Sequence, residues 1–248
     1  MENFLCSFSD IGRPFGRVAA FSQIDNIWMK VLEMAHRRFN IFPTPLIIDE
    51  VKNADALNAE LEKAILERMG ADPGIKRSNV GGWHSNTDLL KWGGPAGSRI
   101  GEHALKLASA NTTTARGADL RWNIAAWANV NGPGAGNAPH VHGGNYWSAV
   151  YYVKVGEGQG GRLTLHDPRL PALRMHSPVL RFTDAGPELT YRFQPKAGQM
   201  LLFPAWLSHS VEAWDGSDHR ISIAMNIRRG RRSKIGVSAP HDSTHSAE

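Results

Sequence analysis

Six short runs of alternating or β-branched residues in the second half of the chain constrain its fold most. They cover residues 120–129, 146–155, 161–166, 189–194, 199–204 and 220–227. Gly, Pro, Asn and Asp separate these runs. Strand side chains alternate between two faces, so such a run can bury one face and leave the other exposed. Several short runs at this spacing are typical of a β-sandwich or a small barrel.

The first half of the chain has a helical pattern instead. Apolar residues recur at helical spacing over Gln23–Phe39, Asn53–Met69 and Ile100–Ala110. We predict Asn53 as an N-cap and Gly70 as a helix end. Pro43 and Pro45 precede a short extended run at residues 46–48, and the polar, glycine-rich residues 74–86 indicate a loop. The predicted fold class is therefore mainly β with N-terminal helices that cover one sheet.

Composition excludes several classes of protein. The chain has 248 residues, is 42% hydrophobic and 21% charged, and so can bury a sizeable core. Its single cysteine, Cys6, excludes an internal disulfide framework and a cysteine-rich zinc site, and it suits the cytoplasm. No signal peptide or membrane span is expected. Much of the net charge of +5 lies in residues 228–234, which we interpret as a solvated tail and not as a nucleic-acid-binding arm.

Three histidines form the most specific candidate site. His140 and His142 are two residues apart on an extended segment, so their side chains should project to the same side. His209 follows a later strand and can complete one face of a metal ion. Because the opposite positions would stay open, the set resembles in chemistry the facial triad of non-haem iron oxygenases.

A possible carboxylate anchor follows the third histidine. Arg220 and Ser222 lie in the alternating run 220–226 and should therefore face the same side of a strand. A guanidinium beside a hydroxyl can bind a carboxylate through charge-assisted hydrogen bonds. A metal site combined with a carboxylate anchor is the minimal chemistry of a 2-oxoglutarate-dependent oxygenase.

The order of these motifs resembles the Fe(II)/2-oxoglutarate oxygenase superfamily, close to its prolyl-hydroxylase-like branch. The shared order is His-x-His, a strand that ends in Tyr-Tyr, Gly-Gly, a Gly-x-x-Leu-x-Phe-Pro run leading to histidine, and Arg-x-Ser. Residues 42–46, 78–85 and 203–209 also resemble a bacterial and phage family of 2-oxoglutarate oxygenases. The resemblance covers roughly residues 41–229.

This resemblance implies a double-stranded β-helix, or jelly-roll, with Fe(II) at the mouth of the barrel. By resemblance, the metal ligands are His140, His142 and His209. Arg220 and Ser222 take the place that grips the C5 carboxylate of the cosubstrate 2-oxoglutarate. Tyr152 matches a tyrosine that helps to bind that carboxylate, and Asn129 lies near the expected position of the C1 end of 2-oxoglutarate.

One residue departs from the superfamily pattern. The usual second ligand is Asp or Glu, whereas this chain has His142. Three neutral imidazoles are acceptable ligands of Fe(II), although the site then carries one negative charge less. Two alternatives stay open, in which Asp167 or a water takes the second ligand position.

The resemblance implies a dioxygenase that couples decarboxylation of 2-oxoglutarate to hydroxylation of a small-molecule or amino-acid-like substrate by O2. One alternative is a three-histidine, cupin-like oxygenase that binds its substrate directly. Another is a non-enzymatic β-sandwich with a structural metal or none. The expected layout is an N-terminal extension at 1–40, an oxygenase domain at 41–229 and a basic, flexible tail at 230–248. Residues 1–40 could pair two copies of the chain as a homodimer.

Overall fold

The computed structural model describes residues 41–115, 118–169 and 189–230. The chain divides into two units at Pro43, and every described helix and strand belongs to the second unit, which begins at Thr44. The helix predicted at 23–39 and the basic tail beyond Gly230 lie outside the described residues. In the described part of the chain, no helix has the length and apolar character needed to cross a membrane.

The described helices all precede β4, and from β4 onward the described elements are strands, as predicted. The helices are α2 (Ala54–Ala71), α3 (Leu89–Trp92) and α4 (Gly94–Ala110). The strands are β1 (Ile47–Glu50), β2 (Asn79–Val80), β3 (Trp83–His84), β4 (Trp122–Asn131), β5 (Gly136–His140), β6 (Trp147–Lys154), β7 (Leu163–His166), β8 (Thr190–Phe193), β9 (Gln199–Pro204), β10 (His209–Val211) and β11 (Arg220–Arg229). All six predicted strand runs are confirmed.

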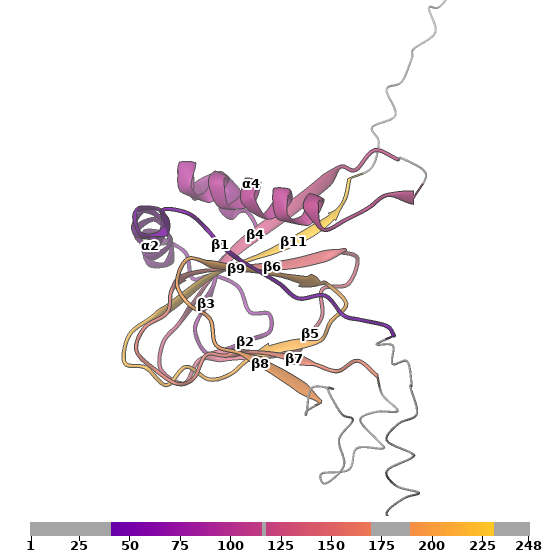
Figure 1. Cartoon of the computed structure of the whole chain (residues 1–248). Helices are drawn as coiled ribbons and strands as arrows, with labels where there is room; N and C mark the ends of the chain where they lie inside the picture. The colour runs from indigo at the N-terminus through magenta and orange to yellow at the C-terminus, as the bar shows by residue number, and fades with distance from the viewer. Residues whose placement is uncertain (1–40, 116–117, 170–188, 231–248) are drawn as a thin grey trace, which may run out of the picture. The chain divides into compact units, whose positions relative to one another are not determined.

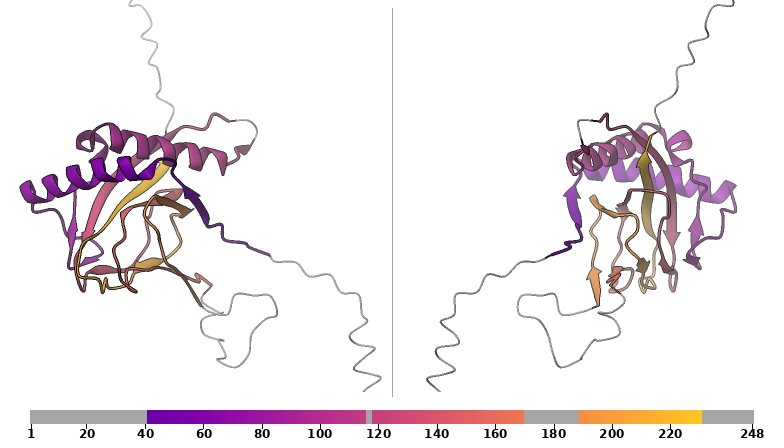
Figure 2. Two further views of the ribbon diagram at one scale, coloured as in Figure 1. Left: turned by 60° about the vertical axis from the view of Figure 1, so that its left-hand side comes forward. Right: turned by 90° about the vertical axis from the view of Figure 1, so that its right-hand side faces the viewer.

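The strands form two antiparallel sheets, which confirms the mainly β, jelly-roll prediction. The larger sheet has the order β1-β9-β6-β11-β4-β3, and the smaller has the order β2-β5-β10-β7-β8. Figure 1 shows the larger sheet between the two long helices and the smaller sheet, and Figure 2 shows the same layers from two other directions. One internal cavity is lined by residues of both sheets, so their inner faces look toward each other.

Helices α2 and α4 cover the outer face of the larger sheet. Leu61 and Ile65 of α2 and Ile100 of α4 are fully buried in one apolar cluster with Ile221 and Ile223 of β11. This burial of apolar surface on the outer face is the main source of stability for the helix layer. The prediction that the helices cover one sheet is therefore confirmed.

Four local predictions in the first half of the chain differ from the structure. Helix α4 begins at Gly94, six residues before the predicted start, because Pro95 occupies its first turn, where a missing N–H costs nothing. Helix α2 continues through Gly70 to Ala71. Asn53 precedes α2 in a left-handed conformation, but its side chain makes no capping hydrogen bond. The predicted loop 74–86 contains the two short strands β2 and β3.

Strand β11 lies between β4 and β6 and connects the core to the inner cavity. Its residues Ile221, Ile223, Met225 and Ile227 point into the helix-covered core. Arg220, Ser222 and Ala224 alternate with them and line the inner cavity. In the register of the sheet, Ser222 lies directly between Asn129 of β4 and Tyr152 of β6. One strand thus holds both the core and one wall of the candidate site.

Candidate metal and cosubstrate site

The side chains of His140, His142 and His209 converge at one point between the two sheets. One ring nitrogen of each lies within 4.8 Å of those of the other two. Nε2 of His142 is 3.2 Å from Nε2 of His209. Two nitrogens bound at right angles to one metal ion with bonds of about 2.1 Å stand about 3 Å apart. The spacing of His142 and His209 therefore fits two neighbouring ligands of one metal ion, and His140 lies close enough to complete the cluster.

Different local structures place the three histidines. His140 ends β5 and His209 begins β10, and the two residues are direct partners in the register of the smaller sheet. His142 lies beyond the end of β5, where its backbone N–H donates to the carbonyl of Ala205 at 3.0 Å. The predicted reason for convergence, alternation along one strand, is thus incomplete, because a turn rather than a strand positions His142.

Hydrogen bonds orient two of the imidazoles for metal binding. Nδ1 of His140 is 2.7 Å from the carbonyl oxygen of Ala138, and Nδ1 of His209 is 2.8 Å from that of Leu207. A carbonyl can only accept, so in the neutral ring Nδ1 carries the proton. This leaves the lone pair of Nε2 free to bind a metal in both rings, and the carbonyl holds the ring in place.

Burial keeps the three histidines neutral. Desolvation lowers the pKa of His209 to about 3 and, together with the nearby His140, lowers that of His142 to about 4. Desolvation also lowers the pKa of His140. Neutral imidazole is the form that coordinates a metal, so protons do not compete strongly for these nitrogens near neutral pH.

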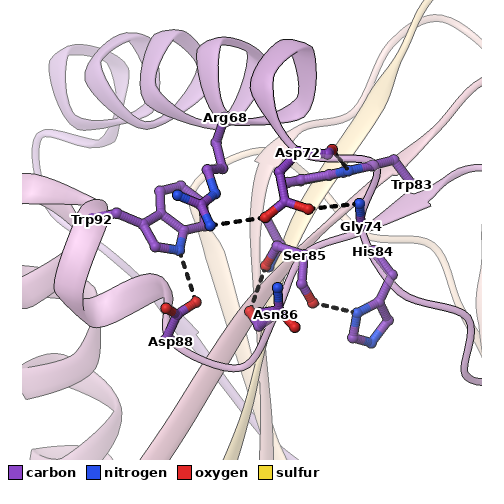
Figure 3. A network of polar contacts seen from close by, with 10 residues as sticks. Arg68, Asp72, Gly74, Trp83, His84, Ser85, Asn86, Asp88 and Trp92 are labelled. Carbon is purple, nitrogen blue, oxygen red and sulfur yellow. Dashed lines mark hydrogen bonds and ion pairs between the residues drawn. The ribbon is translucent and has the colours of Figure 1, made fainter.

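An aromatic layer supports the histidine cluster from the side of β4. The Trp127 ring lies 5.6 Å from the ring of His142 and stacks on the ring of His84 at 5.5 Å. Nδ1 of His84 is held 2.6 Å from the carbonyl of Ser85. Figure 3 shows how the polar network around Asp72 anchors this segment, with Asp72 accepting hydrogen bonds from Arg68 and from the backbone N–H of Gly74.

The cavity beside the histidines contains a buried arginine that has no acidic partner among the described residues. Arg220 is only 2% exposed, and its Nε makes no hydrogen bond within the described part of the chain. Its guanidinium lies 5.2 Å from the centre of the Tyr152 ring. The buried Tyr152 hydroxyl and Asn129 Oδ1 also lack a partner among the described residues. Buried polar atoms without partners are costly, so this group is built to meet a polar ligand.

All seven residues predicted for the site line this one cavity. They are Asn129, His140, His142, Tyr152, His209, Arg220 and Ser222. Burial raises the pKa of Tyr152 to about 12, although the Arg220 guanidinium opposes the shift. Tyr152 therefore presents a neutral hydroxyl at neutral pH, which can donate to an anion. Burial also lowers the pKa of Arg220 below its usual value.

Tyr151 and Asp167 do not belong to the candidate site. Tyr151 faces away from the cavity and donates from its hydroxyl to Asn58 Oδ1 at 2.6 Å. Asp167, the alternative ligand, forms an ion pair with Arg169 at 2.6 Å and is not part of the histidine cluster.

Sequence reasoning missed Ser78, Asn137 and Ser148 as lining residues, and it did not assign His84 to the site. Their residue types are common in turns and strands, so no local pattern marked them. Trp127 also lines the wall of the cavity.

A family comparison agrees with this site. Residues 125–226 match the family described as "Putative 2OG-Fe(II) oxygenase", a range that contains the three histidines, Arg220 and Ser222. No curated protein matches the sequence.

Solved structures share the fold at low sequence identity. A prolyl hydroxylase from Trichoplax adhaerens, in complex with a peptide fragment of hypoxia inducible factor, is 12% identical, with a TM-score of 0.55, over 87% of this chain and 94% of that one. The epimerase SnoN of nogalamycin biosynthesis is 13% identical, with a TM-score of 0.56, over 82% and 87%. HygX from Streptomyces hygroscopicus, with nickel and 2-oxoglutarate bound, is 14% identical, with a TM-score of 0.52, over 75% and 83%.

Residues 125–226 thus resemble the 2OG-Fe(II) oxygenase family, and the chain shares the double-stranded β-helix fold of solved enzymes of that kind. Enzymes of this superfamily use Fe(II) and 2-oxoglutarate.

Proposed function

We propose that this protein is an Fe(II)- and 2-oxoglutarate-dependent dioxygenase that hydroxylates a small-molecule or amino-acid-like substrate. His140, His142 and His209 hold the metal, Arg220 and Ser222 bind the C5 carboxylate, and Tyr152 and Asn129 contact the cosubstrate. Fe(II) and 2-oxoglutarate supply the oxidising chemistry, in which 2-oxoglutarate is converted to succinate and CO2.

The buried guanidinium of Arg220, which has no acidic partner and an unpaired Nε among the described residues, is the observation that carries this proposal. A buried cation is retained in a protein interior only when an anion or several acceptors compensate it. Among the described residues no carboxylate does so, and the cavity that Arg220 lines also contains the three histidines. A dicarboxylate that reaches from the histidines to the guanidinium satisfies both ends of the site.

The surrounding residues orient and enclose this ligand. Ser222 and the Tyr152 hydroxyl flank Arg220 across neighbouring strands, so together they can donate several hydrogen bonds to one carboxylate. Phe203 packs edge-on against the His209 ring at 4.9 Å and keeps water from that side of the metal centre.

Turnover of 2-oxoglutarate tests the proposal. We expect the purified protein to form succinate from 2-oxoglutarate in the presence of Fe(II) and O2. His209→Ala should abolish this reaction. In Arg220→Ala the KM for 2-oxoglutarate should rise roughly 10- to 100-fold, because a hydrogen-bonded charge pair is lost. Arg162→Ala is the matched control, since Arg162 pairs with Glu212 on the surface.

Two results would contradict this account. If oxidation of a substrate proceeds without 2-oxoglutarate, the cupin-like alternative is correct and Arg220 binds the substrate itself. If a consumed substrate does not gain one oxygen atom, the protein catalyses a different oxidation on the same fold, and the hydroxylase assignment is wrong.

A further inference from the structure

The inner face of β11 continues past the metal centre toward an open pocket. Beyond Ala224, which lines the histidine cavity, the same face of the strand carries Asn226 and Arg228. Across the unbroken register with β4, Arg228 is the direct partner of Asn123, just as Ala224 is the partner of Trp127. Each step of two residues along the strand covers about 7 Å.

An open pocket of about 680 Å³ lies at this end of the strands. Its lining residues come from β4, from β11 and from the segment between β5 and β6. They are Asn123, Gly144, Asn145, Tyr146, Arg228 and Arg229. The segment that supplies Gly144 and Asn145 begins at His142, and the backbone N–H of Asn145 donates to the His142 carbonyl at 3.3 Å. The pocket wall is thus continuous with a proposed metal ligand.

The charge of this pocket is positive, and no side chain among the described residues neutralises it. Arg228 and Arg229 line it, and neither forms an ion pair or a hydrogen bond with the side chain of a described residue. Arg220, Arg162 and Arg192 lie elsewhere, and the latter two pair with Glu212. No acidic residue lines the pocket in the described part of the chain.

A buried acceptor lies between the pocket and the metal centre. Asn226 Oδ1 is buried and has no hydrogen-bond partner among the described residues. Asn226 pairs in register with Ser148, which lines the histidine cavity. An acceptor that is buried without a partner favours a ligand with a hydroxyl or ammonium donor at this depth.

We propose that this pocket is the substrate subsite and that it selects small molecules with a carboxylate or phosphate group. Arg228 binds the anionic group at the mouth, Asn226 accepts a hydrogen bond from a hydroxyl or ammonium group, and the carbon to be oxidised lies beyond them at the histidines. The catalytic part of this assignment rests on the proposed function, whereas the binding of an anion at Arg228 does not.

Binding of inorganic phosphate to the full chain tests the assignment without catalysis. Isothermal titration calorimetry should detect phosphate binding to the wild-type protein. The phosphate affinity of Arg228→Gln should be weaker than that of the wild type by roughly tenfold or more. Arg228→Lys, which keeps the charge, should restore most of the affinity. Arg228 is exposed at the end of its strand, so these variants are expected to fold.

A charge-matched variant distinguishes the subsite from other positive groups. Arg121→Gln removes an exposed guanidinium that does not line the pocket, and it should bind phosphate as the wild type does. Arg220→Gln removes the guanidinium in the cosubstrate cavity and serves as the control for 2-oxoglutarate binding. Equal weakening of phosphate binding in Arg121→Gln and Arg228→Gln, or no phosphate binding by the wild type, would each overturn the proposal.

The same proteins separate this proposal from the proposed function. Arg228→Gln should bind 2-oxoglutarate normally in the presence of Fe(II), whereas Arg220→Gln should not. If the wild type binds phosphate at Arg228 but does not bind 2-oxoglutarate, the cosubstrate assignment fails and the anion subsite stands.

Discussion

At the scale of single residues, the site depends on polar groups that the fold leaves without partners. Arg220, Tyr152 and Asn129 are buried, and each has a side-chain atom that makes no hydrogen bond within the described residues. Such groups lower stability unless a ligand binds. The polar cavity therefore lowers the free energy of unfolding of the ligand-free protein. We expect 2-oxoglutarate to stabilise the protein by binding there.

Gly161 leaves the space that Arg220 occupies. It has a φ of +69°, and a Cβ there would lie 2.7 Å from Cδ of Arg220. We predict that Gly161→Ala lowers the free energy of unfolding by about 1–2 kcal/mol, from backbone strain, and displaces Arg220. The affinity for 2-oxoglutarate should fall as well, and urea unfolding combined with calorimetry measures both effects.

Gly94 provides the matched control for this substitution. It has a similar φ of +60°, but a Cβ there would meet no atom within 4 Å. Gly94→Ala should therefore cost stability without any change in 2-oxoglutarate affinity. If both variants bind 2-oxoglutarate equally well, contact with Gly161 does not position Arg220.

At the scale of elements, the sequence predicted the strands whose residues alternate. The order of Arg220, Ile221, Ser222 and Ile223 indicated a two-faced strand, and β11 indeed places the charged and hydroxyl groups in the cavity and the isoleucines in the core. The position of Arg220 and Ser222 on one face of β11 follows from this alternation, so this part of the candidate site could be predicted.

Two elements near the histidine cluster could not be predicted from local patterns. Strand β5 contains Gly136, Asn137 and Pro139, which have low strand propensity, and it forms because β2 and β10 pair with it. Strand β10 has only three residues. His142 lies outside any strand, and its position depends on a long-range hydrogen bond to Ala205. Such non-local contacts leave no periodic signal in the sequence.

At the scale of the whole molecule, burial of Tyr152 links stability to alkaline pH. The pKa is about 12 in the folded protein and about 10 in an unfolded chain. Because the folded pKa is raised, the contribution is fully present below pH 10 and is lost as the pH rises toward 12. It amounts to about 3 kcal/mol at most.

We therefore predict that the free energy of unfolding, measured with urea, falls between pH 10 and pH 12, and that Tyr152→Phe makes this fall less steep. Tyr191→Phe is the control, because Tyr191 is more than half exposed and lines no part of the cavity. An unchanged slope in Tyr152→Phe would show that Tyr152 ionises as easily in the folded protein as in the unfolded chain.

Anaerobic titration of the protein with Fe(II) and 2-oxoglutarate tests the central claim most directly. Chelation of a 2-oxo acid to ferrous iron gives a visible charge-transfer band. We predict that the band appears in the wild type and in Arg162→Ala, and that it is lost in His209→Ala and, at matched concentrations, in Arg220→Ala. Iron binding without the band would contradict the cosubstrate assignment, and failure to bind iron would contradict the metal centre itself.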